Sequence, residues 1–89
     1  MPSDKQRADE LEAILLALGP FTHKLETEAL PALLNECKLL YTEGRQEEAE
    51  ALEARIEQAR QEIKANNAIL DGIEQELYAL RRRLRDREQ

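Results

Sequence analysis

The chain has 89 residues, of which 42% are hydrophobic and 36% charged, and its formal net charge is −6. This length allows one domain at most, and the lack of an 18-residue apolar run argues against a membrane span. Aromatic residues are few, tryptophan is absent and strong helix formers dominate, so the composition predicts an all-α protein.

The first predicted helix covers residues 3–18, and Ser3 is a suitable N-cap for it. Gly19-Pro20 should end this helix, because glycine favours the position after a helix and proline cannot continue one. Its apolar face comprises Ala8, Leu11, Ile14, Leu15 and Leu18.

The second predicted helix covers residues 22–42 and carries a broad apolar face. Pro31 lies inside it, so the helix either kinks there or ends near Leu30 and restarts. Only a few residues around Gly44 separate it from the next periodic segment. This short connection predicts an antiparallel αα-hairpin.

The third predicted helix covers residues 45–87 and carries an unbroken heptad repeat over five heptads. Apolar residues at the first and fourth positions of each heptad are typical of a coiled coil. The first row is Ala49, Ile56, Ile63, Leu70, Leu77 and Leu84, and the second is Leu52, Ala59, Asn66, Ile73 and Leu80.

These elements predict two short helices and one long C-terminal helix within a single helical domain, residues 1–89. The second helix would run out opposite Ile63, and the first would fold back to complete a three-helix bundle. The half of the long helix at 66–87 would then project as a coiled coil and need a second chain. The predicted homodimer interface comprises Asn66, Leu70, Ile73, Leu77, Leu80 and Leu84.

A parallel pair is favoured over an antiparallel one, because Asn66 would then meet its own copy and hydrogen-bond with it. Flanking charges agree, since Glu76 of one chain would lie near Arg81 of the other. A dimer and a tetramer both stay open, because leucine at the first position with isoleucine at the fourth also suits four strands.

No residue pattern points to catalysis, a cofactor or a metal. His23 is the only histidine, and Cys37 lies on the apolar face of the second helix as a small hydrophobe. The glutamates of 47–62 are interleaved with arginines, which is typical of a solvated helix surface. The sequence therefore predicts a protein that is not an enzyme.

An arginine cluster near the C-terminus is the candidate partner-binding site. Residues 81–89 carry a net charge of +3, whereas residues 1–80 carry −9. Such a cluster suits an acidic protein surface or phosphate, or simply the negative end of a helix dipole. Its members are Arg81, Arg82, Arg83, Arg85 and Arg87.

The sequence thus predicts a non-catalytic, dimeric protein–protein interaction module, such as an adaptor, assembly factor, scaffold or small regulatory inhibitor. The alternative is a nucleic-acid-associated accessory protein that uses the arginine cluster, which the acidic body disfavours. A single cysteine, which rules out an internal disulfide, fits a cytoplasmic protein.

Overall fold

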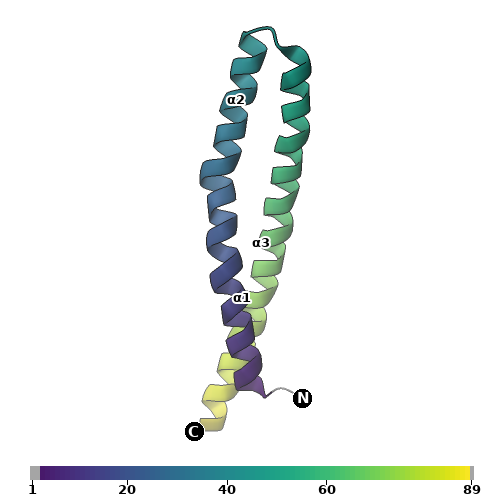
Figure 1. Ribbon diagram of the computed structural model, residues 1–89. Helices are drawn as coiled ribbons and strands as arrows, with labels where there is room; N and C mark the ends of the chain where they lie inside the picture. The colour runs from purple at the N-terminus through teal and green to yellow at the C-terminus, as the bar shows by residue number, and fades with distance from the viewer. Residues whose placement is uncertain (1–2, 89) are drawn as a thin grey trace.

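The computed structural model describes residues 3–88, and this part of the chain is almost entirely helical, without strands. Helix α1 (Asp4–Lys24), a π-helical turn (Leu25–Ala29) and α2 (Leu30–Thr42) follow one another without a break and form the first arm. Helix α3 (Gln46–Glu88) forms the second arm and runs back alongside the first (Figure 1). The molecule is a rod, with principal extents of 67 × 20 × 14 Å.

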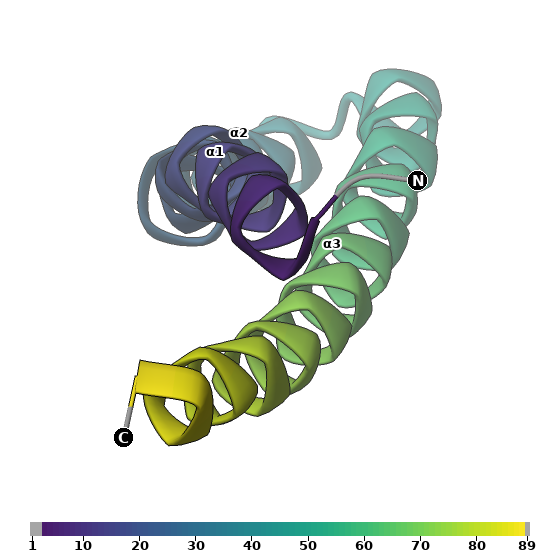
Figure 2. The same cartoon turned by 90° about the horizontal axis from the view of Figure 1, so that it is seen from below.

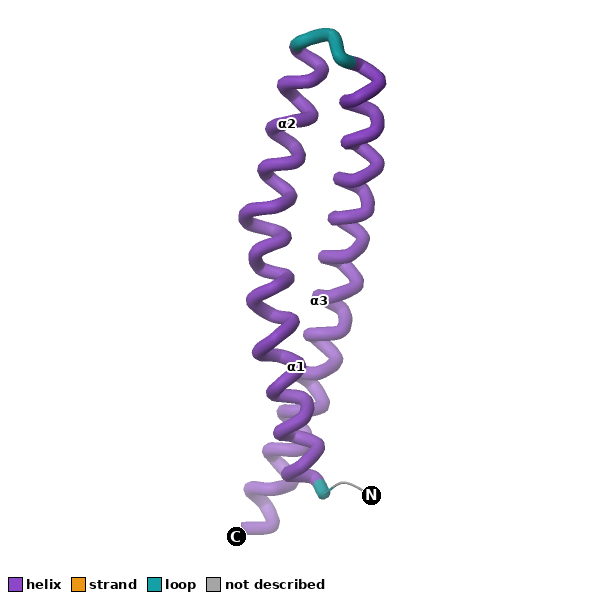
Figure 3. Tube along the Cα trace, viewed as in Figure 1, coloured by secondary structure: helices purple, strands orange, loops and turns teal. Residues whose placement is uncertain are grey.

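The two arms meet at a tight turn around Gly44, the only loop between them (Figure 3). Gly44 has a φ of +76°, which glycine adopts without strain. Its N–H donates to the carbonyl of Tyr41 at 3.1 Å, and the N–H of Arg45 donates to that of Leu40 at 2.9 Å. These two bonds form a Schellman motif, so the turn predicted at Gly44 has a defined helix-ending geometry.

The first helix does not end at Gly19-Pro20, so the predicted boundary at residue 18 is wrong. α1 runs through this pair and still contacts α3 beyond it. Thr22 is only 2% exposed, and Leu18 and Leu25 are half-buried. An interior proline costs about 3 kcal/mol, and continued burial along α3 offsets that cost.

A single π-helical turn joins α1 to α2, where the N–H of Leu30 donates to the carbonyl of Leu25, five residues back. The stripe that faces α3 explains this extra residue. Its members are three or four residues apart within each run, but five residues separate Leu25 from Leu30, and the wider turn absorbs the difference. The two runs are Ala8, Leu11, Leu15, Leu18, Thr22 and Leu25, then Leu30, Leu33, Cys37 and Leu40.

Pro31 lies directly after the π turn, in the first turn of α2. A proline lacks the N–H of a helical hydrogen bond and its ring clashes with the carbonyl four residues back, so the wider π turn just before Pro31 accommodates it better than a regular α-helix would. The chain stays helical on both sides of Pro31, with the π turn before it and α2 starting at Leu30.

Because the first arm is continuous, it covers α3 along nearly its whole length. The first helix does not fold back to form the three-helix bundle that the sequence predicted. The C-terminal half of α3 packs against α1 instead of projecting alone. Seen along the rod, α3 bows around the first arm (Figure 2). One core cluster joins Ala8 and Leu11 to Ile73, Leu77 and Leu80, and another joins Cys37 to Ala49, Leu52 and Ile56.

Candidate interaction surface

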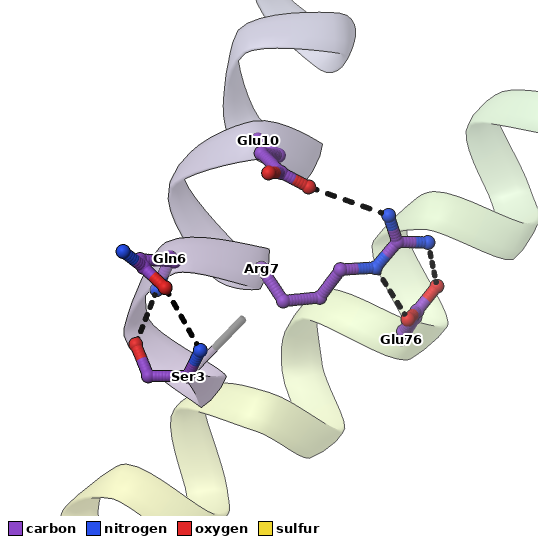
Figure 4. Close-up of polar contacts among 5 residues, drawn as sticks. All are labelled: Ser3, Gln6, Arg7, Glu10 and Glu76. Carbon is purple, nitrogen blue, oxygen red and sulfur yellow. Dashed lines mark hydrogen bonds and ion pairs between the residues drawn. The ribbon is translucent and has the colours of Figure 1, made fainter. Parts of the chain in front are cut away.

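Arg7 ties the beginning of the first arm to the C-terminal part of α3 (Figure 4). Its Nε donates to Glu76 Oε1 at 3.1 Å and its Nη2 to Glu76 Oε2 at 3.4 Å, and Glu10 lies 3.6 Å from its Nη1. The hydrogen bond to Glu76 raises the pKa of Arg7 above its ordinary value. A capping box between Ser3 and Gln6 fixes the start of this helix.

Three contacts lie along the opposite side of the paired arms. Glu12 pairs with Arg81 at 3.7 Å, and Glu26 accepts a hydrogen bond from Asn67 at 2.8 Å. Tyr41 donates to Glu53 at 2.6 Å. Within α3 the partners Glu53, Asn67 and Arg81 are fourteen residues apart and therefore share one heptad position. We call this side of the hairpin the polar flank, defined by these three pairs.

The other side, which includes the Arg7–Glu76 pair, carries three exposed apolar residues. Ile14 and Phe21 are seven and fourteen residues after Arg7, and Ile69 is seven residues before Glu76, so all three continue the rows of that ion pair. Their exposed fractions are 44%, 51% and 51%, respectively. We call this side the isoleucine flank, defined by Ile14, Phe21 and Ile69.

The sequence-based interpretation did not find this surface. The predicted apolar face of the first helix includes Ile14, which is exposed, and neither predicted stripe includes Phe21 or Ile69. The signal was present, because Phe21 and Ile69 lie outside the stripes formed by Ala8 to Leu25 and by Ala49 to Leu84. Large apolar residues just beside a coiled-coil stripe widen the apolar surface and are typical of helices with more than one neighbour.

The residues predicted as a homodimer interface face α1 of the same chain. Ile73, Leu77 and Leu80 are buried in the cluster with Ala8 and Leu11. The remaining three, Asn66, Leu70 and Leu84, are half-buried within the single chain. The stripe therefore has a partner in its own chain, while self-association stays a prediction.

Three of the five clustered arginines also contact the first arm. Arg81 pairs with Glu12, and Asp4 lies 3.8 Å from Arg83 and 3.3 Å from Arg87. Asp4 is in the first turn of α1, where a carboxylate also favours the helix dipole. Arg82 and Arg85 are exposed, without an ion pair among the described residues. Much of the cluster thus joins the two ends of the hairpin.

A hollow on the polar flank near the turn is lined by residues that include Leu34, Cys37, Tyr41 and Ile56. The hydrogen bond to Glu53 raises the pKa of Tyr41 to about 12. The Cys37 thiol donates to the carbonyl of Ala49 at 3.5 Å, and burial, with the nearby Glu53 charge, raises its pKa. A raised pKa disfavours the thiolate, which is the nucleophilic form of cysteine.

No group of three or more histidine, cysteine, aspartate or glutamate residues that could hold a metal ion occurs within residues 3–88. His23 is exposed on α1, apart from the buried Cys37. In the same part of the chain, no helix combines the length and the apolar character that crossing a membrane requires.

Comparison with known proteins gives no relative for this chain. No protein-family model matches it, and neither a curated protein nor a solved structure is significantly similar.

Proposed function

We propose that this protein is a non-catalytic, self-associating module for protein–protein interaction. Its role would be that of an adaptor, assembly factor, scaffold or small regulatory inhibitor in the cytoplasm. The observation that carries the proposal is the large surface that the hairpin leaves uncovered.

The chain exposes 6866 Å² of accessible surface. A compact monomer of 10.3 kDa would expose about 5,400 Å², so the hairpin exposes about 1,500 Å² more. Stable homodimers bury about 2,000 to 5,000 Å² in total, or half of that on each chain. If a second copy covered the excess surface of each chain, the total buried area would lie in the range of stable homodimers.

The composition of the uncovered surface supports the same proposal. Two helices that pack only on each other bury one stripe each, so apolar side chains outside these stripes stay exposed. Among the residues that the structure describes, eight large apolar ones stay exposed by 40% or more: Ile14, Leu16, Phe21, Leu34, Leu39, Tyr41, Ile69 and Tyr78. Pairing of two hairpins into a four-helix bundle would bury part of this surface.

The arginine cluster supports nucleic-acid binding less well than protein binding. Arg81, Arg83 and Arg87 already pair with acids of the first arm, and the cluster contains no aromatic residue for base stacking. We therefore do not propose the nucleic-acid alternative.

Sedimentation equilibrium of the purified full chain tests the proposal directly. We expect a mass of about twice 10.3 kDa at micromolar concentration. The dimer should persist in 0.5 M salt, because the buried surface is apolar and salt screens only charges. A monomer at all concentrations up to 100 µM would contradict the proposal.

A further inference from the structure

The isoleucine flank has the anatomy of an interface core with a polar rim. Ile14, Phe21 and Ile69 form its apolar centre, at the middle of the rod and toward its N-terminal end. The Arg7–Glu76 ion pair closes one end of this stretch. Toward the turn the same row of α3 continues with Glu62 and Arg55, which are charged and exposed. Interfaces between proteins commonly place charges around an apolar centre in this way.

Small residues border the apolar centre on its outer side. Ala65 and Gly72 are four residues before and three residues after Ile69, so they are its neighbours on the helix surface. Ala17 stands in the same relation to Ile14 and Phe21. All three small residues are exposed in the single chain. They would let the backbone of another helix approach closely beside the large apolar side chains.

Gly72 is an independent indication of such an approach. It lies in the middle of the 43-residue helix α3, where glycine is less favourable than alanine by about 1 kcal/mol. A Cβ atom at this position would meet nothing within 4 Å, so packing within the chain does not require a glycine. A second helix close to the backbone would require one.

The polar flank lacks these features over most of its length. Its pairs Glu12–Arg81, Glu26–Asn67 and Tyr41–Glu53 satisfy polar side chains across the two arms. Covering them with an apolar surface would remove water from these charged groups, which costs free energy. The isoleucine flank is therefore the surface that a second hairpin covers at the lower cost.

We infer that two copies of this chain associate through their isoleucine flanks and form a four-helix bundle. The inference rests on the self-association proposed above and assigns its interface. The occupant is a second copy because the excess surface of about 1,500 Å² matches one side of a homodimer. A two-fold axis would place the same flank of each hairpin at the contact, as in most homodimers.

One experiment compares Ile69→Glu with Tyr78→Glu by sedimentation equilibrium. Both residues lie on α3 and are exposed, Ile69 by 51% and Tyr78 by 68%, but Tyr78 lies away from the isoleucine flank. A glutamate at 69 would be buried in the proposed interface, so we expect the dimer dissociation constant to rise at least about 100-fold. The Tyr78 variant should stay within about threefold of the wild type, and both should keep their helical circular dichroism.

A second pair of variants tests the close approach at Gly72. Gly72→Leu adds a side chain whose Cβ meets nothing within 4 Å in its own chain, whereas Ala68→Leu adds one at an outward position a single turn away. Both should leave the helical content unchanged or higher. Only Gly72→Leu should weaken the dimer, by about tenfold or more, because it would keep the second helix at a distance.

The outcomes separate this inference from the proposed function. If the wild type is a dimer and neither Ile69→Glu nor Gly72→Leu weakens it, the assignment to the isoleucine flank is overturned while self-association stands. If Tyr78→Glu or Ala68→Leu dissociates the dimer as strongly, the interface lies on another face and the assignment is again overturned. A monomeric wild type overturns both proposals.

Discussion

Arg7 and Glu76 form a two-bond ion pair across the arms, although 69 residues separate them in the sequence. The contact joins the second turn of α1 to the C-terminal part of α3. The contact shows that the first arm extends along residues 66–87, the segment that the sequence predicted to project alone. Both side chains are about half exposed, so the pair contributes more to alignment of the arms than to stability.

The cluster around Leu11 should carry much of the stability of this end of the hairpin. Leu11 is 2% exposed, so Leu11→Ala should lower the free energy of unfolding by about 2 to 4 kcal/mol. Leu16 is 68% exposed, and Leu16→Ala should change the free energy of unfolding by less than about 0.5 kcal/mol. Urea denaturation followed by circular dichroism measures both. Equal effects would mean that α1 does not bury Leu11 against α3.

The π turn predicts an unusual response to deletions. Deleting Glu28 would reduce the separation of Leu25 and Leu30 from five residues to four. The first arm could then form one continuous α-helix with its stripe in register but with Pro31 in its interior, so we expect only a moderate fall in the melting temperature. Glu36 is also exposed. Its deletion would move Cys37 and Leu40 off the stripe, so it should lower the melting temperature strongly.

The Glu36 deletion serves as the control, because it removes the same residue type from the same arm. Thermal unfolding by circular dichroism distinguishes the two variants. A Glu28 deletion as damaging as the Glu36 deletion would show that the π turn has a role other than matching the two stripes.

Asn66 should limit stability within the hairpin rather than set the register between chains. The pairs Arg7–Glu76 and Glu26–Asn67 fix the register of the two arms, which places Asn66 at the level of the buried Thr22. Asn66→Leu should therefore stabilise the fold by about 1 kcal/mol, since an apolar side chain replaces a half-buried amide. Asn67→Leu is the control and should give no such gain, because it loses the bond to Glu26. Thermal unfolding measures both, and a destabilised Asn66→Leu would contradict this role.

The Tyr41–Glu53 bond predicts a loss of stability in alkaline solution. The pKa of Tyr41 is raised to about 12 in the folded chain, whereas an unfolded tyrosine loses its proton near pH 10. The contribution of the Tyr41–Glu53 bond to the free energy of unfolding is complete below about pH 10. It is lost as the pH rises toward 12, because tyrosine in the unfolded state ionises first.

Absorbance titration at 295 nm measures this pKa when Tyr78→Phe leaves Tyr41 as the only tyrosine. The midpoint should lie near 12 and should fall toward 10 when Glu53→Gln removes the carboxylate. Equal midpoints near 10 with and without Glu53 would show that the hydrogen bond does not persist in solution.

Much of the fold was predictable from local patterns. The heptads of α3 predicted the long helix, Gly44 predicted the turn, and composition predicted an all-helical chain. The failure lay at Gly19-Pro20, where the local rule for ending a helix was outweighed by burial of Thr22 and its neighbours along α3. Such burial depends on the partner helix and is not visible in the segment itself.

That one boundary determined the predicted interface as well. A short first helix left the stripe at Leu77 and Leu80 without a partner in the chain, which required a second chain there. The one-residue phase change between Leu25 and Leu30 was the available clue, since two stripes offset by one residue can face the same helix through a π turn. The isoleucine flank became recognisable only once the inner stripe had its partner.

The rest of the architecture depends on one unbroken arm, from α1 through α2, that lies along α3. Distance measurement by double electron–electron resonance tests it most directly, with spin labels on Glu10→Cys and Glu47→Cys in a Cys37→Ala background. Dilution with unlabelled chain limits the signal to distances within one molecule. A continuous arm places the labels at opposite ends of the rod, roughly 50 Å apart at 1.5 Å per residue. A first helix folded back toward the turn would bring them within about 25 Å, since bundle helices pack about 10 Å apart, and would contradict the account.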